Sequence, residues 1–204
     1  MPREAKRCLI IGLTGSSGSG KSEAAKILSG HGASVIDADA ISHEVAERRE
    51  TLDELSRAFG AWVIDKDGRF NRGSVSERAF SDGEFLAALT AITHKYIVNE
   101  IYERVDKLKA EGCGIIVIDA PIPVKKGFLD ISDVVWVVKS PRSRRLQRVV
   151  ERDGIGLGAA EARFASQLPD DEYDKLADAV ILNDGNLQDL ADELSRRLRM
   201  LSEA

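Results

Sequence analysis

The sequence is poor in the residues that mark specialised protein classes. Its 204 residues include two cysteines and five prolines, and aromatic residues make up 5% of the chain. Two cysteines cannot build a disulfide scaffold, and the spacing of Cys8 and Cys113 fits no metal site. We interpret both as small buried apolar residues flanking predicted strands rather than as a disulfide.

Long hydrophobic runs and a strong excess of one charge are also missing. No apolar run approaches the length of a membrane span. The charged segment 1–7 precedes an apolar run that is too short for a signal peptide. The formal net charge of −5 gives no reason to expect a nucleic-acid partner. We therefore expect a cytoplasmic protein, with neither nucleic acid nor a membrane as partner.

A glycine-rich segment, GLTGSSGSGKSE over residues 12–23, is the first positive signal. Read alone, it could be a flexible linker. However, an apolar run typical of a strand (9–13) precedes it, and an apolar helical stripe follows from Lys21. The spacing also fits G-x-x-x-x-G-K-S, so the segment is predicted to be a phosphate-binding loop, or P-loop.

Each residue type in this loop has a physical role in holding a triphosphate. Glycines let main-chain N–H groups close around phosphate oxygens, and a helix N-terminus adds unpaired N–H groups. Lys21 is expected to reach the β- and γ-phosphates of ATP, and the Ser22 hydroxyl to bind Mg²⁺. The predicted phosphate-binding residues are Gly15, Ser16, Ser17, Gly18, Ser19, Gly20, Lys21, Ser22 and Glu23.

Strand and helix patterns alternate along the rest of the chain. Further strands are predicted at 34–37, 114–119, 134–138 and 179–182, as continuous apolar runs typical of strands covered on both faces. The alternation predicts an α/β protein with a five-stranded parallel sheet, the P-loop NTPase fold. An amphipathic helix over 187–201 is expected to pack back on the sheet.

Two segments interrupt this alternation. Residues 40–111 are largely helical and far exceed the length of a crossover, which predicts an inserted helical domain. Residues 141–175 are rich in arginine around a glycine-rich joint, which is typical of a lid over a polyphosphate. The nucleotide-binding core is then formed by residues 1–39, 112–140 and 176–204.

The arginines of the predicted lid fall into two groups. Arg148, Arg152 and Arg163 are expected to contact ligands. The others are expected on a solvated helix face: Arg142, Arg144 and Arg145.

A P-loop alone does not distinguish a kinase from a GTPase or a motor ATPase. The Asn-Lys-x-Asp motif of GTPases is missing, and Asp119 is followed by Ala120 where a motor ATPase has a catalytic Glu. Asp119, at the end of the third strand, could hold the water shell of Mg²⁺ or cap the following turn.

A second carboxylate site follows the second strand. Strand alternation places Asp37 and Asp39 on the same side, at the sheet edge where ligands bind. Asp39 could accept the proton of an alcohol during phosphoryl transfer, or it could be the N-cap of a helix starting at Ala40.

Several motifs together resemble the dephospho-CoA kinase family. The similarity covers residues 8–198, with its elements in family order. The segments that carry it are GLTGSSGSGKS, GASVIDADAISHEV, FGAWVIDKDGRFNRGSVSERAF, ITHKYIVNEI, IIVIDAP, LQRVVERDGI with EARFASQ, and ADAVILNDG.

The resemblance implies that ATP phosphorylates the ribose 3′-hydroxyl of dephospho-CoA, with Mg²⁺ as cofactor and residues 40–111 as the domain for the acceptor. By motif, Asp39 would be the catalytic base. Lys21 would be the second catalytic residue, by holding the triphosphate. Arg72 and His94 would face the acceptor, although His94 could equally be satisfied within the helical domain. We expect a monomer.

The resemblance also implies ligand contacts from the lid and from the last strand. Arg148 and Asn183 would border the adenine of ATP. Arg152 and Arg163 would approach phosphates from the lid, with Arg163 on the acceptor side.

Four departures from the family pattern concern substrate affinity: Glu23, Lys95, Lys125 and Leu182. Two alternatives therefore stay open. One is a P-loop kinase for another small alcohol or a nucleotide, and the other is an ATP-binding homologue without activity.

Overall fold

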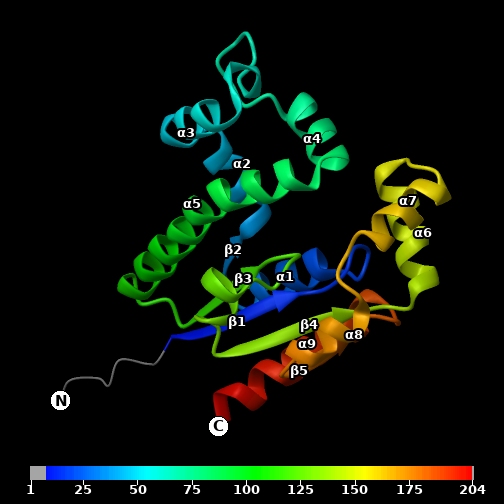
Figure 1. The fold of residues 1–204 in the computed structure, drawn as a ribbon. Helices are drawn as coiled ribbons and strands as arrows, with labels where there is room; N and C mark the ends of the chain where they lie inside the picture. Colours follow the sequence, from blue (N-terminus) through cyan, green and yellow to red (C-terminus); the bar gives the residue numbers. More distant parts are fainter. Residues whose placement is uncertain (1–7, 204) are drawn as a thin grey trace. The chain divides into compact units, whose positions relative to one another are not determined.

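The computed structural model describes residues 8–203 and contains a five-stranded parallel sheet (Figure 1). The strand order is β2-β3-β1-β4-β5, and every neighbouring pair is parallel. The predicted α/β fold with five parallel strands is therefore confirmed. The strands are β1 (Leu9–Thr14), β2 (Ser34–Asp37), β3 (Ile115–Asp119), β4 (Val134–Lys139) and β5 (Ala179–Leu182).

The division of the chain into two compact units organises the rest of the structure. One unit contains the sheet and is formed by the chain up to Asp37 and from Val105 onward. The other unit is helical and runs from Ala38 to Arg104. Besides the strands, the sheet unit contains α1 (Lys21–Gly30), η2 (Lys125–Leu129), α6 (Arg142–Asp153), α7 (Leu157–Ala165), α8 (Asp170–Leu176) and α9 (Leu187–Glu203).

The central strands are covered because their apolar residues occupy both faces. In β1, every residue from Ile10 to Thr14 is buried, as is typical of a strand in the middle of a parallel sheet. Helices α1 and α9 contact each other and share one apolar cluster with the sheet. Leu28 of α1 and Leu190 and Leu194 of α9 are almost fully buried in this cluster, as expected for the C-terminal amphipathic helix.

The helical unit has its own small core. Leu55, Val63, Val75 and Phe85 are buried together, and the Phe59 ring lies 4.6 Å from the Phe85 ring, centroid to centroid. Its buried residues come from α3 (Arg49–Phe59), η1 (Ala61–Val63), α4 (Arg72–Ser81) and the first part of α5 (Gly83–Ala110). The unit begins with a further helix, α2 (Ala38–Ala46). Helix α5 continues beyond the boundary of the unit at Arg104.

Ion pairs fasten the helices of this unit to α5. The Glu100 carboxylate, which is largely buried, accepts hydrogen bonds from Arg48 and, at 2.7 Å, from Nε of Arg104. Arg104 also pairs with Glu44 of α2. The two guanidinium groups, Arg48 above all, lower the pKa of Glu100, so this carboxyl group remains ionised.

The structure corrects two local predictions. Helix α2 already begins at Ala38, so Asp39 lies in its first turn and is neither a continuation of strand β2 nor an N-cap. Cys8 and Cys113 have free thiols, but both are partly exposed rather than buried. Within residues 8–203, no helix combines the length and apolar character that crossing a membrane requires.

Candidate functional site

The P-loop connects β1 to α1 and is shaped by three glycines with positive φ. Gly15, Gly18 and Gly20 have φ values of 151°, 76° and 97°, which side chains disfavour. Gly20 precedes α1 without any side-chain cap, and its carbonyl oxygen accepts the first helical bond, from Ala24 N–H. The N–H groups of the first turn therefore have no partner within the helix and form an anion-binding terminus.

The outer side of the loop is braced by side chains from distant elements. Nδ2 of Asn183 donates to the Ser19 carbonyl oxygen at 2.8 Å, and the Arg148 guanidinium donates to the Gly18 carbonyl oxygen at 3.1 Å. The C=O and N–H of one peptide plane point in opposite directions. Fixing the Ser19 carbonyl outward therefore turns the Gly20 N–H inward, toward the concave side of the loop.

A buried ion pair joins the loop to the neighbouring strand. The Lys21 ammonium donates to Oδ1 of Asp119, the last residue of β3, and their side chains are 14% and 8% exposed. In parallel strands β1 and β3, Leu13 is paired with Asp119, which sets this carboxylate beside the start of the loop. The adjacent Ser22, at the start of α1, is exposed.

A pocket of about 200 Å³ adjoins the loop. Arg148 and Asn183, which brace the loop, also form part of its wall. Glu23 is a further wall residue, and its carboxylate pairs with Lys26 at 2.6 Å, so its negative charge has a cation beside it. The other lining residues are Gly20, Gly185, Asn186, Leu187 and Leu190.

The two lid arginines expected at phosphates share one carboxylate. Asp153 at the end of α6 accepts from Arg152 at 2.7 and 3.0 Å, and it also pairs with Arg163 of α7. These hydrogen bonds, Arg152 first, lower the pKa of Asp153 to about 2. In the structure, Arg152 and Arg163 are therefore held side by side by one ionised carboxylate.

Arg145 contradicts the prediction of a solvated face. Its side chain is buried against the loop, where it donates to Oγ of Ser16 and, at 2.6 Å, to Oδ2 of Asp170. Arg142 and Arg144, in contrast, are exposed as predicted. The P-loop is held by another residue that the sequence analysis missed: Gln167, whose Oε1 accepts from Ser17 N–H at 3.1 Å.

The predicted acceptor-site residues of the helical unit lie on three different helices. Asp39 is exposed in the first turn of α2, and His94 is half-buried on α5. Arg72, at the start of α4, donates to the His43 carbonyl oxygen at 3.2 Å and lies over the Phe70 ring. Lys95 lies within α5 and pairs with Glu54 at 2.6 Å.

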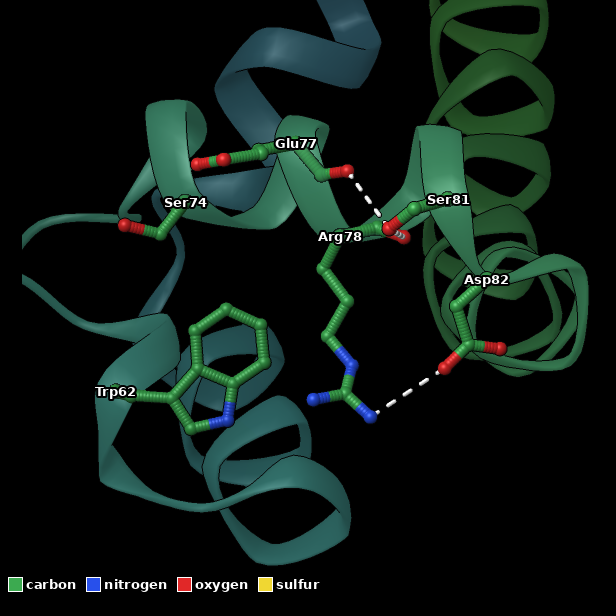
Figure 2. A pocket seen from close by; sticks show the side chains of 6 residues that line it. All are labelled: Trp62, Ser74, Glu77, Arg78, Ser81 and Asp82. Carbon is green, nitrogen blue, oxygen red and sulfur yellow. Dashed lines mark hydrogen bonds and ion pairs between the residues drawn. The ribbon is translucent and has the colours of Figure 1, made fainter.

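The helical unit also contains a pocket of about 480 Å³, shown in Figure 2. The Arg78 guanidinium lies near its centre, donating to Asp82 at 3.3 Å and resting 5.5 Å from the centroid of the Phe85 ring. Trp62 closes the opposite wall, and the remaining lining residues are Ser74, Glu77 and Ser81. Four of the lining residues lie within the segment FGAWVIDKDGRFNRGSVSERAF, but no role was predicted for them from the sequence.

The described residues contain no group of three His, Cys, Asp or Glu side chains that could hold a metal by themselves. Mg²⁺ commonly combines one or two oxygen ligands of the protein with water molecules and with phosphates of a bound substrate. The Ser22 hydroxyl and the Asp119 carboxylate supply oxygen atoms of the right kind for such an arrangement.

The parallel sheet and the P-loop define the sheet unit as a phosphate-loop nucleotide-binding fold. The model of the family described as dephospho-CoA kinase matches residues 9–189. The chain belongs to the dephospho-CoA kinase family.

Individual relatives agree with this assignment. The chain is 42% identical to a dephospho-CoA kinase of Corynebacterium glutamicum over 89% of this chain and 94% of the relative. Among solved structures, a Thermus thermophilus protein matches with a TM-score of 0.81 at 33% identity, covering 96% of this chain and 99% of the other. The dephospho-CoA kinase of Campylobacter jejuni matches with a TM-score of 0.72 at 28% identity, covering 95% and 97%.

Proposed function

We propose that this protein transfers the γ-phosphoryl group of ATP to the ribose 3′-hydroxyl of dephospho-CoA, yielding coenzyme A and ADP. The observation that carries this proposal is the braced P-loop with its Lys21–Asp119 pair, in a chain that belongs to this family from residue 9 to residue 189. Phosphoryl transfer depends mainly on positioning and on neutralising phosphate charge, and a P-loop supplies both.

On the donor side, the inward N–H groups of Gly15–Glu23 bind the phosphates, and Lys21 exchanges Asp119 for the β- and γ-phosphate oxygens. The adenine occupies the 200 Å³ pocket beside Arg148 and Asn183. Both side chains line that pocket while bracing the loop, so base and phosphates are bound by one connected framework. Arg152 approaches the phosphates from the lid.

Mg²⁺ would be held by the Ser22 hydroxyl and, through water, by Asp119. When bound, it neutralises charge on the β- and γ-phosphates. The chain's own contribution is to keep both oxygen ligands at the start of α1 and the end of β3.

On the acceptor side, Asp39 accepts the proton of the 3′-hydroxyl as the phosphoryl group arrives. The Asp39 carboxylate is exposed in the first turn of α2 and is therefore accessible to a substrate hydroxyl. Arg72 and His94 contact the acceptor, and Arg163 reaches it from the lid. We further propose that the protein works as a monomer, which light scattering would test.

The proposal is tested with purified protein, ATP, Mg²⁺ and a panel of acceptors in an assay coupled to ADP. Dephospho-CoA should be phosphorylated, and mass spectrometry should find the added phosphate on the ribose 3′-oxygen. Turnover of another small alcohol or a mononucleotide, but not of dephospho-CoA, would favour a different kinase. ATP binding without any product would identify an inactive homologue.

A further inference from the structure

Arg145 is the most deeply buried of the lid arginines, at 5% exposure, and it is not among the proposed ligand-binding residues. Its two terminal nitrogens have different partners: one donates to Ser16 Oγ in the P-loop, and the other donates to Asp170 at the start of α8. Its guanidinium carbon lies 5.2 Å from the centroid of the Phe164 ring on α7. One side chain therefore contacts the loop and every helix of the lid segment.

The main chain of Arg145 packs against the loop as well. A Cβ atom placed on Gly18 would lie only 2.5 Å from the Arg145 carbonyl oxygen. Helix α6 thus approaches the loop so closely that a side chain at position 18 would clash with its backbone, which favours glycine there. Contacts of the backbone and of the side chain both fix α6 against the leading half of the loop.

The second partner of Arg145 belongs to a helix that is itself anchored. The Tyr173 hydroxyl of α8 donates to the Pro121 carbonyl oxygen at 2.9 Å, two residues after Asp119. Asp170, three residues before Tyr173, is therefore carried by a helix fixed to the segment after β3. The lid segment is connected to the sheet at both ends, since α6 follows β4 and α8 precedes β5. Arg145, itself on α6, therefore links the loop to the first and last helices of the lid.

Burial of this charge is not explained by hydrogen bonding alone. Among the described residues, Nε of Arg145 is buried without a hydrogen-bond partner, which costs stability. An apolar residue would fill the same space without that cost, as buried ion pairs replaced by apolar residues often show. The arrangement places a positive charge and a rigid two-pronged donor beside a loop that binds anions.

From these contacts we propose that Arg145 is a positioning residue for ATP. It holds Ser16 and the adjoining part of the P-loop, up to Gly18, in the conformation that binds anions. Through Asp170, it also connects this conformation to α8. The proposal rests on the proposed kinase function only in assuming that ATP is the ligand of the loop. Because Arg145 acts through Ser16, its loss should weaken phosphate binding and allow water into the site, while leaving the acceptor unaffected.

The test compares Arg145→Gln with Arg144→Gln, since Arg144 is the exposed neighbour on the same helix. Arg145→Gln should weaken ATP binding about tenfold, as loss of a charge-assisted hydrogen bond would. Hydrolysis of ATP per phosphoryl transfer should rise, and the KM of the acceptor should not change. Arg145→Lys, which keeps the charge, should restore part of the ATP affinity, and Arg144→Gln should behave like the wild type.

A second variant identifies the partner. Ser16→Ala removes the acceptor of the Arg145 hydrogen bond, so its effect on ATP affinity should not add to that of Arg145→Gln. ATP affinity is measured by calorimetry without acceptor, so this result stands even if dephospho-CoA is not the substrate. An Arg145→Gln variant with a lower melting temperature but unchanged ATP affinity and unchanged hydrolysis would overturn the proposal. Fully additive effects of the two substitutions would overturn the role of Ser16.

Discussion

The side-chain amide of Asn183 donates a buried hydrogen bond of 2.8 Å to the main-chain oxygen of Ser19, 164 residues earlier in the chain. The same nitrogen lies 2.0 Å from the position that a Cβ atom on Gly20 would take. The residue after β5 and the P-loop therefore fit each other closely. Besides its own glycines, the loop is therefore supported by the residue that follows β5.

Replacing Asn183 by alanine should both destabilise the protein and weaken ATP binding. The Ser19 carbonyl would lose a buried partner, which costs about 1–3 kcal/mol of unfolding free energy. Urea denaturation and calorimetry measure the two effects. Leu182→Ala is the matched control, because Leu182 is adjacent but 62% exposed. An Asn183→Ala variant with wild-type ATP affinity would contradict the role of this brace.

Alanine substitutions at two glycines with nearly the same φ can distinguish the cost of backbone strain from the cost of a steric clash. Gly18 has a φ of 76° and lies against Arg145, whereas Gly112 has a φ of 78° with nothing within 4 Å of a Cβ atom. Gly112→Ala should cost about 1–2 kcal/mol, from the left-handed conformation alone. Gly18→Ala should cost more and also abolish measurable ATP binding. Equal losses of stability in the two variants would show that α6 does not constrain the loop.

The Asp119→Asn substitution should destabilise the free protein more than the ATP-bound protein. Without ATP, Lys21 would lose the carboxylate that neutralises its largely buried charge, at a cost of about 1–3 kcal/mol. With saturating ATP, phosphate oxygens replace that carboxylate, so the difference should shrink. Thermal denaturation with and without ATP measures this. The same loss under both conditions would mean that Lys21 does not move to the nucleotide.

The Asp39→Asn substitution should leave ATP affinity unchanged and lower turnover by about 10²-fold or more, because the amide cannot accept the hydroxyl proton. Single-turnover kinetics with dephospho-CoA and calorimetry with ATP measure the two quantities. Asp53→Asn, an exposed carboxylate on α3 of the same unit, is the control and should retain activity. Near-normal turnover of the Asp39→Asn variant would remove Asp39 from the mechanism.

The Asp153 carboxyl group should titrate with a pKa of about 2, below its ordinary value of 3.8. A lowered pKa means that its pairing with arginine is complete above about pH 4 and is lost as the pH falls toward 2. Carbon-13 NMR of the carboxyl group measures this. Arg152→Gln should raise the pKa more than Arg163→Gln, since Arg152 has the largest effect, and Arg144→Gln should not change it. A midpoint near the ordinary value in the wild type would show that the cluster does not form in solution.

The sheet was predictable from sequence because each strand leaves a local signature. A parallel strand covered on both faces needs a continuous apolar run, and all five such runs became strands. The P-loop was predictable for a similar reason, since positive φ at Gly15 and Gly20 restricts these positions to glycine. In both cases, the constraint lies within a few consecutive residues.

The burial of Arg145 was not predictable, because burial depends on tertiary contacts. Arg144 and Arg145 look alike in sequence, but consecutive residues on a helix point about 100° apart. That rotation turns one side chain to solvent and the other toward Ser16. The predicted local structure at Asp39 was wrong for another reason. The period of two that holds within β2 was extended past Asp37, where the chain changes to the helical period at Ala38.

Helix α5 gives the two junctions of the helical unit different mechanical properties. At Asp37–Ala38 the chain passes directly from a strand into a helix, and a few dihedral angles can absorb a rotation. At the other junction, α5 runs unbroken from Gly83 to Ala110, and its hydrogen-bond ladder resists twisting. The two chain connections of the helical unit therefore differ: one is a strand-to-helix junction and the other is a continuous helix. The continuous helix ends five residues before β3, the strand that carries Asp119 at its end.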